Sequence, residues 1–246
     1  MSGTIASTEL RPMLADRLLR HVLAFTLQGV DLPKGVGVLD PFNGENSDEV
    51  RRIVTTFHRA FYSDERPRVL MLGINPGRLG AGSTGLSFTD TKRCESDLLI
   101  PVHGLRTHEP SSDFFYRMIR AAGGAEAFYS QVYVHAICPL GFVKHHGAGN
   151  AINLNYYDDP ALEKAVTPFV ESWLRTLVGC GMRTDVAFCI GTGKNAAYFT
   201  QLNERLQLFD RIMALEHPRY VMQYKAKQLD VYIDKYVDAL VNAGFS

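Results

Sequence analysis

The chain has 246 residues, of which 46% are hydrophobic and 21% charged, and its 26 basic and 26 acidic side chains give a formal net charge of zero at pH 7. This balance is typical of a folded globular protein, and it excludes disordered, collagen-like and coiled-coil chains. Because the first residues lack the apolar core of a signal peptide and no apolar run reaches a membrane-spanning length, we expect a cytoplasmic protein without a membrane span.

The four cysteines give no sign of a disulfide framework or of a metal site. Cys94, Cys138, Cys180 and Cys189 form no Cys-x-x-Cys pair and have no histidine at zinc-ligand spacing. We therefore predict reduced, mostly buried thiols, no metal and no cofactor.

The first third of the chain is predicted to be helical. No repeat or linker divides the sequence, so we predict a single domain over residues 1–246, with residues 1–62 as its N-terminal helical part. Helices are expected at Ser7–Gln28 and Ser47–Tyr62, because apolar side chains recur there at helical spacing behind a serine start.

Short apolar runs and helical patterns alternate in the rest of the chain. Four buried strands are predicted at Val69–Ile74, Val132–Ile137, Val186–Ile190 and Ile212–Leu215. Further helices are predicted at Ser111–Ala122, Pro160–Val178, Lys194–Leu206 and Lys225–Val241. This alternation predicts an α/β fold with a mostly parallel sheet. Ligands of such folds bind beyond the carboxyl ends of the strands, so the segments that begin at Asn75, Cys138, Gly191 and His217 carry the functional prediction.

The segment after the first strand is rich in glycine. It runs from Gly73 to Phe88 with five glycines, which let the backbone approach a ligand closely, and with Asn75, whose amide both donates and accepts hydrogen bonds. These properties suit the binding of one water and one polar edge. The alternative is a structural turn, since Asn-Pro-Gly is ordinary turn chemistry. The segment lacks the Gly-Lys-Ser/Thr ending of a nucleotide-hydrolysing loop.

Two further strand ends carry polar side chains with open alternatives. Asn150, Asn153 and Asn155 lie in a predicted Gly-rich loop, where they either present amides to the edge of a base or satisfy their own backbone. The segment Gly191–Ala196 matches Gly-x-Gly-x-x-Ala with Asp210 nineteen residues on, which by itself suggests a dinucleotide site. Asp210, however, precedes the next strand instead of ending it. The alternative is a helix N-terminus at which Lys194 contacts a phosphate.

The fourth strand ends at His217, which is followed by Pro218. A histidine held in this way donates a hydrogen bond to developing negative charge, although a lone histidine is commonly structural. The presence of Asn75 at the same predicted edge favours a functional role.

Charge is segregated toward this edge. The segments 75–95, 138–157, 191–200 and 217–229 carry an excess of six positive charges, which the rest of the chain balances. Such an excess is expected of a protein that binds a phosphate backbone. The basic residues concerned are Arg78, Lys92, Arg93, Lys144, Lys194, Arg219, Lys225 and Lys227.

In this order the motifs resemble the uracil-DNA glycosylase superfamily, and most closely its single-strand-selective monofunctional (SMUG-like) branch. The resemblance rests on Leu72–Gly77 with Phe88, on His135–Leu140, and on His217 with Pro218. It covers residues 67–228, the predicted catalytic core, and implies a four-stranded parallel sheet flanked by helices.

The resemblance implies hydrolysis of the N-glycosidic bond of an extruded deoxyuridine, leaving an abasic site. Extrusion costs a few kcal/mol and is easiest for a mispaired or single-stranded base. By resemblance, Asn75 positions the attacking water and His217 donates a hydrogen bond to the uracil carbonyl. The implied base-binding residues are Gly77, Phe88, Cys138 and Pro139. The implied DNA-binding residues are Lys194, Arg219, Tyr220 and Lys225, with Arg219–Tyr224 as a wedge loop.

Two positions depart from the family pattern. Ala136 stands where the family has the asparagine that contacts the uracil edge, so we predict that Asn153, or Asn150 or Asn155 in its place, supplies the amide, or that the base specificity has changed. Arg219 and Tyr220 follow Pro218 directly, which predicts a wedge of different shape.

The sequence therefore predicts a monomeric, monofunctional glycosylase that acts on uracil or a related deaminated base in single- or double-stranded DNA, in base excision repair. Two alternatives stay open. One is a weakly active or inactive relative that binds damaged or single-stranded DNA, and the other is a nucleotide-cofactor enzyme that uses Gly191–Ala196.

Overall fold

A computed structural model describes residues 12–25, 30–146 and 150–245, apart from the side chains of residues 145, 146 and 150. The four predicted strands form one parallel sheet in the order β3-β2-β6-β7, which confirms the α/β prediction. Their bounds are β2 Val69–Gly73, β3 Val132–Ala136, β6 Ala187–Ile190 and β7 Ile212–Leu215. All residues of β2 and β6 are buried, as their continuous apolar sequence predicts.

The carboxyl ends of the strands lie level with one another. Gly73 pairs with Ala136, and Ile190 pairs with Leu215. The register continues past the strands, because the Ile137 amide donates to the Gly73 carbonyl at 2.9 Å and the Gly191 amide donates to the Leu215 carbonyl at 2.7 Å. The segments that follow the four strands therefore share one edge, as the sequence predicts.

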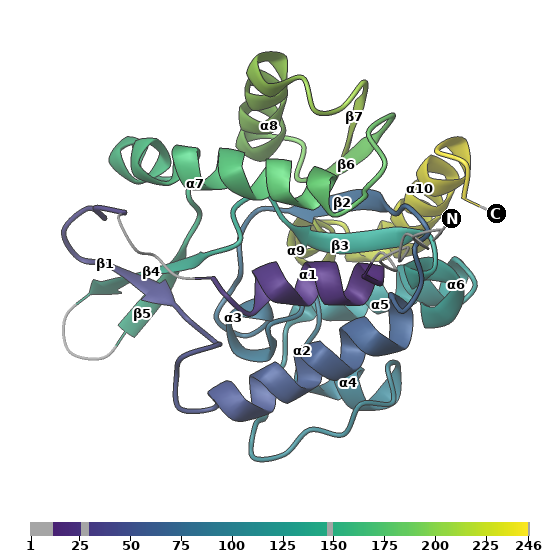
Figure 1. Cartoon of the computed structure of the whole chain (residues 1–246), viewed down its shortest axis with the longest axis horizontal. Helices are drawn as coiled ribbons and strands as arrows, with labels where there is room; N and C mark the ends of the chain where they lie inside the picture. The colour runs from purple at the N-terminus through teal and green to yellow at the C-terminus, as the bar shows by residue number, and fades with distance from the viewer. Residues whose placement is uncertain (1–11, 26–29, 147–149, 246) are drawn as a thin grey trace, which may run out of the picture.

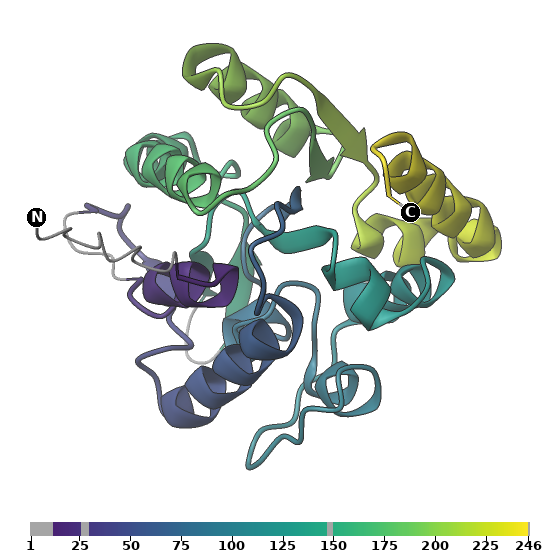
Figure 2. The same cartoon turned by 45° about the vertical axis from the view of Figure 1, so that its right-hand side comes forward.

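Helices cover both faces of this sheet (Figures 1 and 2). Helices α7 (Pro160–Gly179) and α8 (Lys194–Leu206) lie at the top of Figure 1, with α2 (Ser47–Phe61) below the sheet. Together with α5 (Pro110–Ala121), these helices match the predicted ranges to within one residue at each end. Three short helices, α3 (Ala81–Thr84), α4 (Thr91–Ser96) and α6 (Ala125–Tyr129), have no predicted counterpart.

The N-terminal helix α1 spans Leu14–Val22 and packs on α2. Its first amides donate to the end of α2 and the residues after it, Leu14 to the Asp64 carbonyl and Ala15 to the Tyr62 carbonyl, both at 2.8 Å. The prediction Ser7–Gln28 was too long, because residues 12–13 and 23–25 are described and lie outside the helix. Residues 7–11 and 26–28 lie outside the described residues.

A second sheet replaces the loop that the sequence predicts over residues 144–157. Strands β4 (Gly141–His146) and β5 (Asn150–Leu154) form an antiparallel hairpin, and β1 (Val36–Leu39) joins β4, to the left in Figure 1. The sequence prediction was wrong here because the glycines and asparagines of the segment dominate its composition. Its first strand also lacks a period-2 alternation, because Phe142 and its neighbour Val143 are both buried while Lys144 is exposed.

The predicted wedge loop Arg219–Tyr224 is instead part of helix α9, Pro218–Tyr224. Pro218 occupies the first helical turn, where its fixed φ favours the helix and its missing N–H costs nothing. The single helix predicted over Lys225–Val241 is divided into a 3₁₀ turn, Ala226–Gln228, and α10, Leu229–Asn242.

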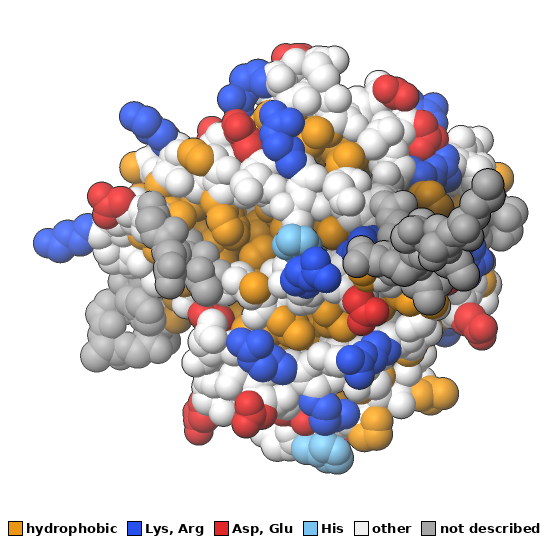
Figure 3. Space-filling model, in the orientation of Figure 1, with side chains coloured by type: hydrophobic (Ala, Val, Ile, Leu, Met, Phe, Trp, Pro, Cys, Tyr) orange, Lys and Arg blue, Asp and Glu red, His pale blue; other side chains and the backbone are white. Residues whose placement is uncertain are grey.

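Two surface properties follow from this packing. None of the helices in the described part of the chain is long and apolar enough to cross a membrane. On the face of α1, α2 and α7, Lys and Arg side chains lie among Asp and Glu side chains around a band of hydrophobic ones (Figure 3). This face therefore lacks the single-sign charge expected of a surface that follows a phosphate backbone.

Candidate active site

Asn75 lies just beyond β2, and its half-buried side chain is fixed by two backbone groups. Its Nδ2 donates to the Leu154 carbonyl at 3.2 Å, and its Oδ1 accepts from the Tyr156 amide at 3.2 Å. Each atom of the amide faces a group of the opposite kind, so its orientation is determined by its partners. Nδ2 also donates to the Pro76 carbonyl at 3.5 Å, and one lone pair of Oδ1 remains for a water or a substrate.

The Tyr156 side chain anchors the segment that holds Asn75. Its hydroxyl donates to Asn195 Oδ1 at 2.8 Å, and Asn195 Nδ2 donates to the Ile190 carbonyl at 3.1 Å. Both side chains are buried. The network ties the N-terminus of α8 to the predicted water-positioning residue. Sequence reasoning missed Tyr156 and assigned Asn195 only to a possible cofactor motif.

Replacing Tyr156 by phenylalanine should lower the free energy of unfolding by about 1–3 kcal/mol, because Asn195 Oδ1 then stays buried without its donor. The Tyr156 amide and therefore its bond to Asn75 are retained, so base release should change less than stability. Chemical denaturation of Tyr156→Phe measures the loss. Tyr157→Phe is the matched control, since the half-buried Tyr157 hydroxyl has no hydrogen bond within the described ranges. Equal stability of the two variants would contradict the role of the network.

His217 precedes α9 and caps it. Its Nδ1 accepts from the Arg219 amide at 3.1 Å, so the proton of the neutral ring is on Nε2. Burial lowers the pKa of His217 to about 3, and the positive charge of Arg219 contributes to the same shift. His217 is thus a neutral hydrogen-bond donor at physiological pH, with Nε2–H as its available group.

Phe88 lies beside His217 in a strained backbone conformation. Its φ of 53° is in the left-handed region, which a bulky side chain rarely adopts. The ring stacks on Phe115 with centroids 4.7 Å apart and lies 5.6 Å from the His217 ring. A Cβ on Gly73 would lie 2.9 Å from its Cζ, so the glycine permits this position. Only 8% of Phe88 is exposed. The predicted stacking of Phe88 on a base would have to use this small exposed part of the residue.

Cys138 and Pro139, predicted to contact the base, lie differently from the prediction. The Cys138 side chain is fully buried and its thiol donates to the Leu140 carbonyl at 3.6 Å, while burial raises its pKa to about 12. A base therefore has no access to this side chain, and only the backbone of the segment is left for the predicted role.

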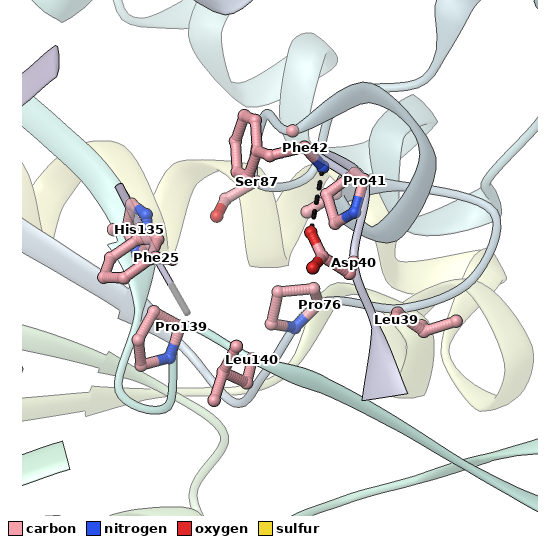
Figure 4. Close-up of a pocket in the computed structure, with 12 residues that line it drawn as sticks. Phe25, Leu39, Asp40, Pro41, Phe42, Pro76, Ser87, His135, Pro139 and Leu140 are labelled. Carbon is pink, nitrogen blue, oxygen red and sulfur yellow. Dashed lines mark hydrogen bonds between the residues drawn. The ribbon is translucent and has the colours of Figure 1, made fainter. Parts of the chain in front are cut away.

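Pro139 lines a hollow on the β1 side of the glycine-rich segment (Figure 4). Its other walls include Phe25, Pro76 and Ser87, and the Asp40 carboxylate there accepts from the Phe42 amide at 3.2 Å. Neither Asn75 nor His217 lines this hollow. Its mostly apolar walls and the prior engagement of Asp40 give no reason to place the reacting base in it.

Asn153, in contrast, lies against the glycine-rich segment, and its predicted contact with the base stays a prediction. Its Oδ1 accepts from the Arg78 amide at 3.2 Å, and its Nδ2 lies 3.6 Å from where a Cβ on Gly77 would be. Asn155 lines a hollow together with His217. The side chain of Asn150 lies outside the described residues.

A groove runs past His217 along the predicted DNA-binding residues. Two adjoining hollows of about 230 and 240 Å³ share Ile74, His217 and Tyr220. Arg219 lines the first and Lys194 lines the second, so the structure brings these two cations and Tyr220 to one groove. Lys225 is half-buried at the end of α9 and lines neither hollow.

Most of the basic side chains predicted for this edge are exposed and free to bind an anion. Six of the eight basic residues are exposed, and none of these six forms an ion pair within the described residues: Arg78, Lys92, Lys144, Lys194, Arg219 and Lys227. Arg93 is a correction, because it is buried and pairs with Asp113. The sequence prediction counted Arg93 by its position along the chain, which does not reveal that α4 directs this side chain into the protein.

The dinucleotide alternative also needs an acidic residue, free to bind a ribose, at the end of the strand that follows Gly191–Ala196. Asp210 precedes β7, and its amide donates to the Thr184 carbonyl at 2.8 Å. Glu216, which does follow β7, is held by Lys235 at 2.7 Å. Glu216 lines the hollow of Gly191 and Lys194, but its carboxylate is engaged in this ion pair instead of being free for a ribose hydroxyl. Within the described residues, no three His, Cys, Asp or Glu side chains gather as metal ligands.

Comparison with known proteins identifies the class to which this fold and site belong. The model of the uracil DNA glycosylase superfamily matches residues 60–241, and the chain belongs to this superfamily. A solved structure, described as the crystal structure of wild-type Pedobacter heparinus SMUG2, is 44% identical to it, with a TM-score of 0.92. The match covers 96% of this chain and 100% of that one, which confirms the resemblance to the SMUG-like branch.

Proposed function

We propose that this protein is a monofunctional DNA glycosylase that releases uracil or a related deaminated base from DNA and leaves an abasic site, as the first step of base excision repair. Membership of the superfamily supports DNA as the substrate and glycosylase as the enzyme class. The observation that carries the proposal is the pairing of a fixed amide, Asn75, with a neutral donor, His217, beside one cationic groove. We propose a cytoplasmic monomer as the working form.

The proposed reaction breaks the bond between C1′ of the sugar and the base nitrogen, and forms a bond from C1′ to a water oxygen. The water gives up one proton to solvent, and the released base anion takes up one proton from solvent. The electron pair of the broken bond leaves with the base, whose carbonyl oxygen gains negative charge. His217 Nε2–H donates a hydrogen bond to that oxygen, which stabilises the departing base more than the intact one. The free lone pair of Asn75 Oδ1 accepts a hydrogen bond from the water and holds it for attack.

The groove supplies binding. Arg219 and Lys194 are exposed beside the two hollows that meet at His217, and phosphate oxygens are their natural partners. Tyr220 and Tyr224, 43% and 66% exposed, lie with ring centroids 5.6 Å apart on α9. Exposed aromatic rings of this kind stack on unpaired bases, so α9 is proposed to replace the predicted wedge loop.

A second candidate, a relative that binds DNA without releasing a base, is favoured by one observation. Ala136 ends β3 with a buried methyl group, and its carbonyl accepts from Trp173 Nε1 at 3.3 Å. The end of β3 therefore offers no side-chain amide to a base, and recognition must come from other residues.

Base release from labelled oligonucleotides decides between the two candidates. The substrates are single-stranded and paired DNA with uracil, hypoxanthine, xanthine or a T:G mismatch, and alkali shows abasic sites as strand breaks. We expect breaks at uracil only after alkali. Silence on every substrate, together with DNA binding that weakens steeply with salt, would support the binding protein instead. A thermal shift with NAD or NADP would revive the cofactor alternative.

A further inference from the structure

A small niche lies over Gly77, between the side chains of Asn153 and Glu109. A Cβ on Gly77 would lie 3.6 Å from Asn153 Nδ2 and 3.6 Å from Glu109 Oε1, and a Cβ on Gly80 would overlap the Glu109 carboxyl. Glycine at positions 77 and 80 thus leaves room for the Glu109 carboxyl and the Asn153 amide, whereas a side chain at position 80 would displace the carboxyl. Glu109 is not part of the predicted site, and no motif in the sequence indicates it.

The backbone of Glu109 is held firmly while its carboxyl is not. Glu109 is the residue before α5, and its amide donates to Asp90 Oδ2 at 3.0 Å. Asp90 is fully buried and caps α4 through the Arg93 amide. The Glu109 side chain makes no capping hydrogen bond, and its Oε2 is buried without a partner in the described part of the chain.

A buried polar atom without a partner is costly and uncommon, so its position calls for a ligand. The fold needs the Glu109 backbone for the contact with Asp90 but does not use the carboxyl. Glu109 Oε1 faces the niche over Gly77, where Asn153 presents its amide nitrogen, and the unpartnered Oε2 of the same carboxyl lies against Gly80. Because Asn153 Oδ1 is bound to the Arg78 amide, Nδ2 is the atom that faces the niche, and it is a donor only.

Burial of the Glu109 carboxyl favours its neutral form. Desolvation raises the pKa of Glu109 to about 7, with the nearby Asp90 carboxylate adding to the rise and the Arg219 cation opposing it. His108 faces Asp90 at 3.3 Å, and Arg78 lies exposed on the turn. A neutral carboxyl offers one donor and one acceptor side by side.

We propose that Glu109 is a specificity-determining residue that, with Asn153, binds the lactam or imide edge of the base to be released. The acid carbonyl of Glu109 accepts the ring N–H of the base, while its hydroxyl and Asn153 Nδ2 donate to carbonyl oxygens. Uracil, xanthine and hypoxanthine carry such an edge. Cytosine has an amino group where uracil has its O4, and the Asn153 amide nitrogen, fixed as a donor, does not match an amino group at that position. This inference rests on the proposed function.

The neutral acid is the working form for a reason of charge. The departing base gains negative charge, and a carboxylate in the niche would repel it, whereas a neutral acid donates to it. Since the carboxyl loses its proton as pH rises through about 7, base release should slow above that pH.

Binding to uncleavable DNA tests the inference directly. The probes are single-stranded oligonucleotides with 2′-fluoro-2′-deoxyuridine, whose glycosidic bond the fluorine stabilises, and with an abasic site. Glu109→Ala should weaken binding of the fluorouridine probe about tenfold and leave abasic-site binding unchanged. Asn153→Ala should do the same. Glu126→Gln, at an exposed position in α6, is the control and should match wild type in both.

The pH profile of uracil release adds a readout that a purely structural role would not move. Wild type should slow above about pH 7, and Glu109→Gln, which keeps the size, one donor and one acceptor, should remove that decline while staying within a few-fold of wild type at pH 6. A wild-type ratio of fluorouridine to abasic-site binding in Glu109→Ala would overturn the inference, and so would a decline above about pH 7 that persists in Glu109→Gln. If the wild-type protein releases no base, the proposed function is refuted, but the role of Glu109 is not, because binding of the fluorouridine probe tests it separately.

Discussion

Replacing Asn75 by alanine is expected to slow base release by about 100-fold or more, while DNA affinity stays within a few-fold of wild type. The substitution removes the side-chain amide that the structure holds beside β2 and whose oxygen has a lone pair for a water. The amide is preorganised by the Tyr156 amide and the Leu154 carbonyl, so no reorganisation is needed when the substrate binds. The groove cations that bind phosphate are untouched.

Asn75→Asp separates the chemistry of the amide from its size. A carboxylate still accepts from the Tyr156 amide but repels the Leu154 carbonyl, so the side chain loses its fixed orientation. Single-turnover rates with uracil-containing DNA, measured beside binding to an abasic-site oligonucleotide, give both quantities. Asn242→Ala, at an exposed position near the C-terminus, is the control. Release undiminished in Asn75→Ala would remove this residue from the mechanism.

Replacing His217 by alanine is expected to lower the rate about 10²- to 10³-fold, as for the loss of one donor to a developing oxyanion. The ring is neutral down to a pH of about 3, so it has no proton to lose between pH 4 and 9. The rate should therefore show no step near 6.5, the ordinary pKa of histidine, and any decline above 7 belongs to Glu109. A step at 6.5 that disappears in His217→Ala would contradict the neutral donor.

His217 also caps α9, so its removal acts on stability as well as on the reaction. Loss of the cap costs about 1 kcal/mol, whereas asparagine is a good capping residue with a shorter side chain. His217→Asn should therefore retain the melting temperature more closely than His217→Ala and lose activity to a similar degree. Comparable activity of His217→Asn and wild type would show that the cap, and not the donor, is what the reaction needs.

The parallel sheet was predictable because its strands are short apolar runs between turn residues. Ile212–Leu215 and Lys194–Leu206 have the predicted bounds in the structure. The hairpin of β4 and β5 was not predictable in this way, since half of its side chains are polar and its pairing with β1 is a contact across about a hundred residues. Such pairing is decided by tertiary packing and leaves little local signal.

The candidate site was predictable to the extent that it follows strand ends. Asn75 and His217 stand directly after β2 and β7, where the fold class itself points. Glu109 lies between α4 and α5, far along the chain from both, and reaches the niche only because Asp90 holds its backbone. Cys138 shows the opposite error, since its side chain, although within the motif His135–Leu140, is buried after β3.

The amide of Asn75 is bound as a peptide group would be at the end of β5, with one carbonyl and one N–H of the main chain as its partners. The amide proton of Tyr156 is therefore protected from solvent exchange while the Asn75 side chain, which is proposed to act in the reaction, accepts it. Its deuterium exchange rate reports the fraction of molecules in which that side chain is correctly seated, in the absence of DNA. The orientation of the Asn75 side chain can thus be followed by exchange at one backbone amide in the DNA-free protein.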